Sequence, residues 1–417
     1  MPPLFSVVIP TFNRSDLFPY AVKSILNQTF QDIEIVLSDN CSGDNTREVA
    51  HQFEDARFKY VCTPRHYTIA DSWEFARMQA SGSLIIMLSD DDALVKSALE
   101  RYATEVEDPD GDFLCSNVGE YRDDSFPGED KNSLSCPRFS GSSSVISADE
   151  FVRTLFSFQP KFVMHPSAFA FPKKIAEYVE SRTGRFFWTN GVEYSAWPIS
   201  ALFSKRMVYV DLPLTILGRT GKSWGSNISL CNPGKEKIQS FIKDVDHVRK
   251  HAPLHNFTLV NLMAEGMLTA KNLFPDEFAP YDFDEFRYLE RTMLELRRRQ
   301  AMGVDVSSEI DETLRYAGKY PSRESELRAI TAPTEHENDR LRKLVGHNVS
   351  KRIRTFQLSR KLTKGEACRG FRASGKDFGF FDVLGCSEFL EKYVAETESS
   401  SLKMSAIPEC PRMDLQQ

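Results

Sequence analysis

The sequence predicts an α/β fold in which a mostly parallel sheet is flanked by helices and followed by a mainly helical C-terminal region. Short runs of apolar and β-branched residues alternate with segments of helical periodicity through the first ninety residues. From residue 235 to about residue 317 the pattern is then helical almost throughout. Strands separated by helices of this length are parallel neighbours joined by right-handed crossovers.

The alternation supplies four strands and three helices in turn. Each strand is a short apolar run that ends at polar or turn-forming residues, as the run 5–9 ends at Pro10. We expect Ser15 or Asp16 to cap the first helix, because such side chains accept hydrogen bonds from the first backbone N–H groups of a helix. The predicted strands are 5–9, 33–38, 58–62 and 84–88, and the two later helices are 46–53 and 69–80.

The pattern is weaker after residue 110. It predicts strands at 112–117, 162–171 and 207–210, a helix at 148–156 and a polar surface loop at 121–144. Pro333 marks a linker. We therefore expect a first domain over 1–230, a helical extension over 231–330, and a third region over 331–417 that contains a basic segment and a loose tail.

Composition argues against several classes of protein. The 417 residues are 41% hydrophobic and 27% charged, which is the balance of a globular protein. No apolar run reaches the roughly 18 residues needed to cross a bilayer, and the first residues lack signal-peptide features, so we expect cytoplasmic residence. The net charge of −7 argues against nucleic acid as a partner. The eight cysteines include no C-x-x-C pair, which predicts free thiols.

Polar clusters follow three of the predicted strands. They occupy residues 11–14, 39–44 and 89–92. In an open parallel sheet, ligands bind where the carboxyl ends of the strands meet. The chain has neither a G-x-G-x-x-G fingerprint after its first strand nor a P-loop motif. We therefore expect a site that holds its ligand with carboxylates.

Three motifs at these strand ends resemble those of family 2 glycosyltransferases with the GT-A fold. They are FSVVIPTFNR at 5–14, IEIVLSDNCSGDNT at 33–46 and LIIMLSDDDAL at 84–94. The resemblance covers residues 1 to about 220. It implies a GT-A type nucleotide-binding sheet and the inverting transfer of a sugar from a nucleotide diphosphate donor to an acceptor hydroxyl. It also implies a divalent metal, Mn²⁺ or Mg²⁺, which would be held by carboxylates and would meet the charge of the leaving diphosphate.

The acidic triplet at the end of the fourth strand is the expected metal site. Aligned with the family's D-x-D pattern, the chain has Ser89 at the position of the first acid. The resemblance then implies Asp91 as the preferred metal ligand, with Asp92 supporting it and Asp90 on the ribose. The alternative is that the triplet only caps a helix that begins near residue 95, although three adjacent carboxylates repel one another unless a cation compensates them.

The nucleotide is expected at the ends of the first two strands. Asp39 corresponds to the family's base-recognising acid, and a carboxylate can accept the imide N–H of uracil or thymine, which favours a UDP- or dTDP-sugar. The alternative for Asp39 is an Asx turn ahead of Gly43. The resemblance implies that the loop of the first motif lies beside the base and ribose. Its residues are Pro10, Thr11, Asn13 and Arg14.

Two later segments complete the expected site. An inverting transfer needs a general base, and the segment NGVEY at 190–194 places Glu193 where the family has one, although an ordinary surface glutamate is the alternative. Arg219 and Lys222, in GRTGKSWGSN at 218–227, suit a loop that closes over the diphosphate; the alternative is an exposed loop with incidental charges. Trp197 either lines an acceptor platform or packs in the core.

The leading hypothesis is thus a metal-dependent glycosyltransferase that acts in polysaccharide or glycolipid assembly, with a saccharide or lipid-linked acceptor. Two alternatives stay open: a metal-dependent nucleotidyltransferase, and a non-catalytic scaffold that binds a nucleotide sugar. Residues 340–364 contain nine basic residues and no acidic one. This basic segment predicts either peripheral contact with an anionic membrane or a helix packed on the catalytic domain or on a second copy of the chain.

Overall fold

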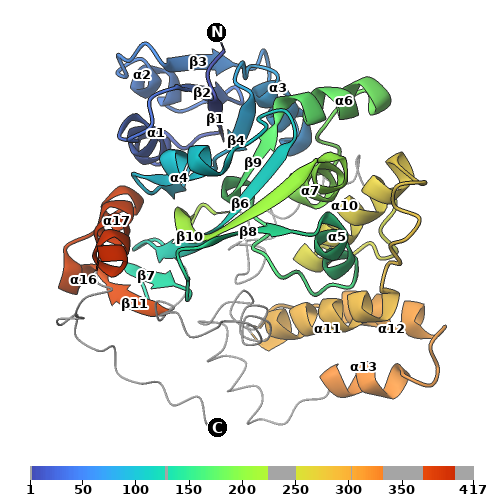
Figure 1. Cartoon of the computed structure of the whole chain (residues 1–417). Coiled ribbons are helices and arrows are strands. Elements are labelled where there is room, and N and C mark those ends of the chain that lie inside the picture. Colours follow the sequence, from blue (N-terminus) through green and yellow to red (C-terminus); the bar gives the residue numbers. More distant parts are fainter. Residues whose placement is uncertain (1, 127–129, 224–249, 302, 332–369, 400–417) are drawn as a thin grey trace.

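The computed structural model describes residues 2–126, 130–223, 250–301, 303–331 and 370–399. Within these ranges the chain forms one mixed sheet with helices on both faces (Figure 1). The strands run in the order β11-β7-β6-β9-β4-β1-β2-β3, and β10 joins them by pairing with β6. The predicted α/β fold with a helical region after it is confirmed.

The first part of the sheet is parallel, as the alternation of strands and helices predicts. Its strands are β1 (Phe5–Thr11), β2 (Ile33–Asp39), β3 (Phe58–Cys62) and β4 (Leu84–Met87), and its helices are α1 (Phe18–Leu26), α2 (Thr46–Ala50) and α3 (Ile69–Arg77). β1 lies between β2 and β4 and is parallel to both. The carboxyl ends of these three strands therefore meet at one edge of the sheet.

The second part of the sheet mixes directions. Its elements are β5 (Ala93–Leu94), α4 (Ala98–Glu105), β6 (Asp112–Arg122), β7 (Ser133–Cys136), β8 (Ser143–Ile146), α5 (Ala148–Phe156), a 3₁₀ turn (Pro166–Ala168), β9 (Phe169–Pro172), α6 (Lys173–Thr183), α7 (Val192–Phe203) and β10 (Arg206–Arg219). β9 is antiparallel to both β4 and β6 and joins the two parts. β10 runs parallel to β6, and its register shifts at Pro213, which has no N–H to donate.

Several predicted elements differ from the observed ones. Neither Ser15 nor Asp16 caps α1: the Ser15 hydroxyl donates to Asn45, and Asp16 pairs with Lys222. The strand expected at 162–171 is limited to β9, because Pro166 opens a 3₁₀ turn before it. The loop expected at 121–144 contains β7 and the first half of β8. The strand expected at 207–210 is the start of the longer β10.

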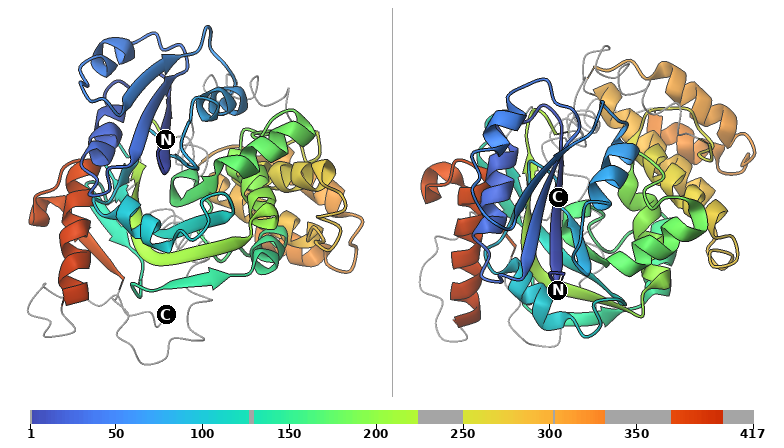
Figure 2. Two further views of the ribbon diagram at one scale, coloured as in Figure 1. Left: turned by 45° about the horizontal axis from the view of Figure 1, so that its top comes forward. Right: turned by 90° about the horizontal axis from the view of Figure 1, so that it is seen from above.

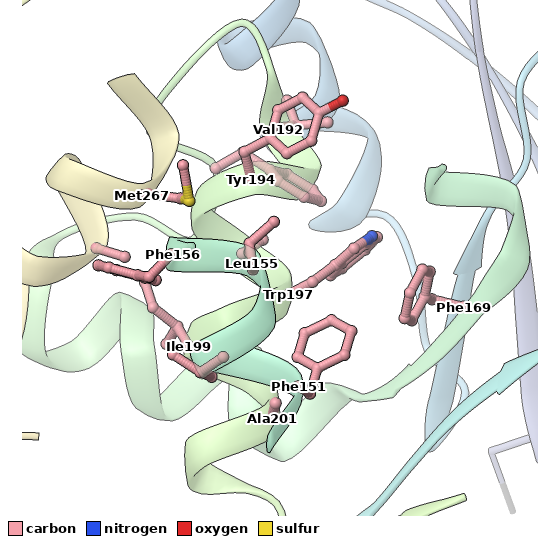
Figure 3. Packing of buried hydrophobic residues seen from close by; sticks show 14 of the residues in the cluster. Phe151, Leu155, Phe156, Phe169, Val192, Tyr194, Trp197, Ile199, Ala201 and Met267 are labelled. Atoms are coloured by element: carbon pink, nitrogen blue, oxygen red, sulfur yellow. The ribbon is translucent and has the colours of Figure 1, made fainter. Parts of the chain in front are cut away.

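Two apolar clusters form the core, one on each face of the sheet. Trp197 of α7 is fully buried in the first cluster, with ring centroids 5.3 Å from both Phe169 and Phe171 (Figure 3). Trp197 is therefore a core residue and does not line an acceptor platform. Tyr194 and Met267 belong to the same cluster, so the helical extension packs directly on α7.

The helical extension consists of α10 (Leu259–Leu273), α11 (Glu285–Ala301), α12 (Ser307–Ala317) and α13 (Glu324–Thr331). The Glu295 carboxylate accepts hydrogen bonds from the backbone N–H groups of Leu259 and Val260, the first two residues of α10. A carboxylate at this end of a helix satisfies unpaired donors and complements the helix dipole. α11 therefore fixes the start of α10, which in turn supports α7.

Residues 370–399 fold onto the sheet, in a region where the sequence predicted no strand or helix, and the Ser-rich tail expected after them lies almost wholly outside the described residues. They form β11 (Phe371–Ser374), α16 (Gly375–Phe378) and α17 (Val383–Ser399), which we call the C-terminal module. β11 adds an antiparallel edge strand to β7. α17 lies beside α1, on the side of the sheet away from α7 and the helical extension (Figure 2). Its Leu390 and Cys386 are fully buried.

Candidate active site

The acidic triplet forms a tight turn directly after β4. Asp90, Asp91 and Asp92 are all buried, and the Asp92 backbone N–H closes the turn on the carbonyl of Ser89. Buried adjacent carboxylates are unfavourable unless cations or hydrogen-bond donors compensate them. Each of the three acids has a different set of partners, and these partners indicate different roles.

Asp90 is held by the loop that follows β1. Its Oδ1 accepts a hydrogen bond from Nη1 of Arg14 at 2.6 Å, and its Oδ2 accepts one from the Thr11 hydroxyl at 2.8 Å. Burial raises the pKa of Asp90, and the charge of Arg14 opposes that shift. Burial alone would lower the pKa of Arg14, but the charges of Asp90 and Asp91 raise it above its ordinary value. The site thus contains an internal ion pair between Arg14 and Asp90.

Asp91 faces the segment that follows β10. Its Oδ2 accepts a hydrogen bond from the Ser223 hydroxyl at 2.5 Å and lies 3.6 Å from Nη1 of Arg14. Among the described residues, no donor reaches its Oδ1. Gly218 is needed at the same place, since a Cβ there would lie 1.8 Å from the Asp91 carbonyl oxygen. Asp91 is therefore the acid of the triplet with a carboxylate oxygen left for a ligand.

Asp92 is tied into the structure through both of its oxygens. Oδ1 accepts a hydrogen bond from the Gly218 backbone N–H at 2.8 Å, and Oδ2 accepts one from the Ser167 hydroxyl at 2.6 Å. Burial, followed by the charge of Asp91, raises the pKa of Asp92 well above its usual range. These contacts favour a positioning role for Asp92 over the supporting metal-ligand role that the sequence predicts.

His165 lies beside Asp92, with its Nδ1 3.5 Å from Oδ2 of that residue. Burial, followed by the charge of Arg219, lowers the pKa of His165 to about 3, so the imidazole is neutral. The sequence analysis did not select this histidine. Ser167, two residues later, links the acid turn to β10, because its carbonyl also accepts a hydrogen bond from the hydroxyl of Thr215.

The loops after β1 and β2 are bound to each other. Asn13, with a φ of +54°, donates its backbone N–H to the Ser42 hydroxyl and accepts a hydrogen bond from the Gly43 N–H, both at 2.8 Å. Asp39 accepts hydrogen bonds from the Ser42 N–H at 2.9 Å and from the Tyr60 hydroxyl at 2.8 Å. Asp39 therefore braces the turn ahead of Gly43, through the N–H three residues on rather than the one two residues on that an Asx turn uses. Pro10 and Thr11 are the last two residues of β1.

Glu193 lies in the first turn of α7, after Gly191. Burial raises the pKa of Glu193 to about 7, although a hydrogen bond from its own backbone opposes the shift. Asn190, just before α7, accepts a hydrogen bond from the Ala70 N–H of α3 at 3.2 Å, which ties the start of α7 to the parallel half of the sheet. A carboxyl group with a pKa near neutrality is suited to general base catalysis.

Arg219 and Lys222 reach the site in different ways. Nε of Arg219 lies 3.4 Å from Oε2 of Glu120, and the charge of Arg219 acts on both Asp92 and Tyr194. Nζ of Lys222 pairs with Asp16 at 2.7 Å. The backbone carbonyl of Lys222 accepts a hydrogen bond from Nη2 of Arg14 at 2.5 Å. The segment 218–223 is therefore closed over the acid turn.

The donor set allows a divalent metal bound through one carboxylate. In the described part of the chain, no group of three or more His, Cys, Asp or Glu side chains is arranged to hold a metal ion. Mg²⁺ and Mn²⁺ sites in nucleotide enzymes are often completed by water and substrate phosphates around one or two carboxylates. Asp91, with its unused Oδ1, fits such a site.

Sequence reasoning missed three hydroxyl groups that organise the site: Ser167, Ser223 and Tyr60. Ser223 lies in the Gly-rich stretch that the sequence did single out, whereas Ser167 and Tyr60 carry no motif of their own. The basic segment 340–364 lies outside the described residues. Across the ranges that the structure describes, no helix combines the length and apolar character required to cross a membrane.

Comparison with known proteins agrees with the motifs. Residues 6–179 match the family model described as Glycosyl transferase family 2. The chain is similar to a GalNAc(5)-diNAcBac-PP-undecaprenol beta-1,3-glucosyltransferase of Campylobacter jejuni, with 41% identity over 100 residues that make up 23% of this chain and 32% of that protein. A UDP-Glc:alpha-D-GlcNAc-diphosphoundecaprenol beta-1,3-glucosyltransferase of Escherichia coli is 31% identical over 97 residues, which are 23% of this chain and 38% of that protein.

The alignments thus span about a third of the length of these two curated relatives. Among solved structures, S. aureus TarS 1-349 in complex with UDP-GlcNAc superposes with a TM-score of 0.45 at 14% identity, over 88% of this chain and 96% of that one. The match to the family model covers the β1, β2 and β4 motifs and the acid turn. Over residues 6–179 this chain is therefore similar to glycosyl transferase family 2.

Proposed function

We propose that the protein is an inverting glycosyltransferase that moves a sugar from a UDP- or dTDP-sugar to an acceptor hydroxyl of a lipid-linked saccharide. The observation that supports it best is the convergence of Arg14, Asp91 and the segment 218–223 at the carboxyl end of β4. The family model covers Arg14 and Asp91 but ends before the segment 218–223, and the two relatives described above act, by name, on undecaprenol-linked acceptors.

The nucleotide would lie across the ends of β1 and β2. Each oxygen of the Asp39 carboxylate accepts one hydrogen bond within the protein and keeps a further lone pair for a ligand. The imide N–H of uracil or thymine is a donor for such an oxygen. The Ser42 N–H and the Tyr60 hydroxyl hold the carboxylate in place, so its orientation is set before the base binds.

The diphosphate would lie over the acid turn. Asp91 would hold Mn²⁺ or Mg²⁺, which supplies electrostatic stabilisation of the leaving diphosphate when bound. Arg14 and Arg219 add fixed positive charge, and Lys222 lies at the outer side in contact with Asp16. When the donor binds, Arg14 can exchange part of its contact with Asp91 for a phosphate oxygen, because that contact is already long, at 3.6 Å.

Glu193 would act as the general base. In its ionised form the carboxylate accepts the proton of the acceptor hydroxyl as the oxygen attacks the anomeric carbon, while the bond from that carbon to the diphosphate breaks. Attack from the face opposite the leaving group inverts the configuration. The pKa of about 7 keeps a large fraction of Glu193 ionised at neutral pH and leaves it basic enough to take the proton.

Release of UDP from UDP-sugars in the presence of Mn²⁺ tests the proposal. Slow hydrolysis without an acceptor, accelerated by an undecaprenol-diphosphate-linked saccharide, is expected. Binding of UDP-sugars with no turnover under either condition would indicate the non-catalytic scaffold. The motive for that alternative is Ser89, which stands where the family has an acid. Pyrophosphate release from UTP and a sugar phosphate would indicate a nucleotidyltransferase.

A further inference from the structure

Two arginines lie side by side at the ends of neighbouring strands. Arg122 and Arg219 are the last residues of β6 and β10, and they are register partners in this parallel pair of strands (Figure 1). Register partners point to the same face of a sheet, from strands about 4.8 Å apart. Like charges in such positions repel each other and destabilise the pairing. These strand ends therefore require a compensating negative charge.

The carboxylate of Glu120 supplies that charge. Glu120 lies two residues before Arg122, so both side chains are on one face of β6. Its Oε1 lies 3.4 Å from Nη2 of Arg122, and its Oε2 lies 3.4 Å from Nε of Arg219. Glu120 and Arg122 are both buried, and a buried charge is costly when its partner is removed. Glu120 thus bridges the two arginines.

Arg122 is itself fixed by further partners. Its Nη1 lies 3.3 Å from Oδ2 of Asp130, which also pairs with Arg372 of β11 at 2.8 Å. Its guanidinium lies over the ring of Phe126, 5.3 Å from the centroid. Burial lowers the pKa of Arg122, and the charge of Glu120 opposes that shift. Arg122 is therefore a fixed cation that orients the Glu120 carboxylate.

Arg219 is the member of this group that faces the candidate site. Its neighbour Gly218 donates its N–H to Asp92, and the charge of Arg219 acts on Asp92 and on Tyr194 of α7. Its side chain is 22% exposed. Among the described residues, none accepts a hydrogen bond from the Arg219 guanidinium. Its donors are therefore available to a ligand.

The contact with Glu120 is made by Nε, the guanidinium nitrogen nearest the backbone. The two Nη groups form the fork with which an arginine binds phosphate oxygens. A side chain that is held before its ligand arrives loses less freedom when the ligand binds, which favours affinity. A carboxylate on Nε can therefore hold the side chain without occupying the fork.

We propose that Glu120 is a positioning residue, which holds Arg219 so that its Nη groups meet oxygens of the donor diphosphate. Arg122 holds Glu120 in turn. The inference rests on the proposed function, because the ligand in question is the diphosphate of a nucleotide sugar. It adds to that function a residue that does not itself touch the donor.

Binding of UDP and of uridine to the full chain tests this role, since uridine has the base and ribose but no phosphate. UDP affinity is measured by calorimetry with Mn²⁺, and uridine binding by ligand-observed NMR. We expect Glu120→Gln to weaken UDP binding on the order of tenfold and to leave uridine binding unchanged. Arg219→Met should weaken UDP binding at least as much. Adding Glu120→Gln to Arg219→Met should cause no further loss, because Glu120 acts through Arg219.

Two further variants separate positioning from stability. Glu120→Gln leaves Arg122 and Arg219 without their shared anion, so a thermal melt accompanies each affinity. Glu120→Gln combined with Arg122→Met removes the repulsion as well as the anion, and it should show the same loss of UDP affinity in a folded protein. Asp112→Asn is the matched control: Asp112 is buried and pairs with Arg206 at 2.8 Å, at the opposite ends of β6 and β10. It should lower the melting temperature without changing UDP affinity.

Three outcomes would overturn the inference: wild-type UDP affinity in Glu120→Gln, equal losses for UDP and uridine, or a further loss when Glu120→Gln is added to Arg219→Met. Sugar transfer reports separately on the proposed function. A protein that transfers sugar, with UDP affinity unchanged in Glu120→Gln, defeats the positioning role alone. A protein that shows the coupled loss of UDP affinity but no turnover with any UDP-sugar defeats the transferase alone. A wild-type protein that binds no UDP defeats both.

Discussion

Arg14 and Asp90 form an ion pair 2.6 Å long, with Asp90 buried and Arg14 partly buried, that joins the loop after β1 to the turn after β4. Removing one member of a buried pair leaves the other charge uncompensated and costs about 3 to 5 kcal/mol. We expect Arg14→Met to lower the free energy of unfolding by about 3 kcal/mol, measured by urea denaturation. Adding Asp90→Asn to that variant should recover part of the loss. If the double variant is less stable than Arg14→Met, the pair is not the source of the effect.

Asp91 and Asp92 should give defects of different kinds. Asp91→Asn is expected to abolish the Mn²⁺ dependence of UDP binding, measured by calorimetry, with little change in stability. Asp92→Asn retains a side chain that accepts one of its two hydrogen bonds, from Ser167 or Gly218, and loses the other. We expect it to keep metal-dependent binding and to lose about 1 to 3 kcal/mol of stability. Equal loss of metal dependence in both variants would place the ion between the two acids.

Asp39 should determine the preference for the base. Asp39→Ala is expected to weaken UDP binding by about 1 to 3 kcal/mol, because a hydrogen bond to a charged group is lost. ADP binding should change little. Asp44→Ala is a control in the same loop: Asp44 accepts hydrogen bonds from Thr46 and from the Ser15 N–H, so its loss disturbs the loop without removing Asp39. Wild-type protein that binds UDP and ADP equally would contradict the assignment.

Glu193 should set the pH dependence of turnover. Since burial raises its pKa to about 7, kcat/KM is expected to rise with pH and to level off above that value. Glu193→Gln should lower kcat by roughly 10² to 10⁴-fold and remove this acid limb, with UDP binding unchanged. A Gln variant that retains near wild-type transfer would show that the base is another residue.

The same raised pKa predicts that Glu193→Gln, which lowers activity, raises the stability of the folded protein at high pH. Between the unfolded pKa of Glu193 and its folded pKa of about 7, the native state binds more protons than the unfolded state, so stability falls as pH rises through that window. Glu193→Gln avoids this loss. We therefore expect the inactive variant to be the more stable protein above pH 7, and to differ less from wild type near pH 5, in thermal melts at both values.

The sequence was sufficient for the parallel half of the sheet, because buried parallel strands such as β1 and β4 are continuous apolar runs whose ends are marked by polar turns. The distinct roles of Asp91 and Asp92 could not be predicted. The two acids are adjacent and chemically identical, and they differ in their partners. Asp92 accepts a hydrogen bond from the Ser167 hydroxyl, whereas Asp91 accepts one from the Ser223 hydroxyl. Such contacts depend on tertiary structure alone.

The C-terminal module was missed for a similar reason. β11 is a four-residue edge strand, too short for a period to be recognised, and Arg372 within it is explained only by its partner Asp130, at 2.8 Å. Asp130 also pairs with Arg122, which pairs with Glu120, the partner of Arg219. This row of alternating charges runs from the edge strand to Arg219 at the end of β10, and its members are far apart in the sequence.

The module should be required for folding, whereas the basic segment should not. A chain that ends at residue 331 loses β11 and α17, which exposes the apolar surface that Cys386 and Leu390 cover. It also loses the Glu391 carboxylate, which accepts hydrogen bonds from Ser97 at the start of α4. Loss of two buried side chains and a helix cap amounts to several kcal/mol, comparable with the whole stability of a domain.

We therefore expect the chain truncated at residue 331 to aggregate or to melt without a cooperative transition in calorimetry. An internal deletion of residues 340–364, which keeps the module, should melt close to wild type and retain UDP binding. Glu391→Ala is the graded test within the intact chain, with an expected loss of about 1 kcal/mol because the Ser97 N–H at the start of α4 loses its acceptor. A cooperative, UDP-binding protein that ends at residue 331 would show that the module is an accessory to a domain already complete without it.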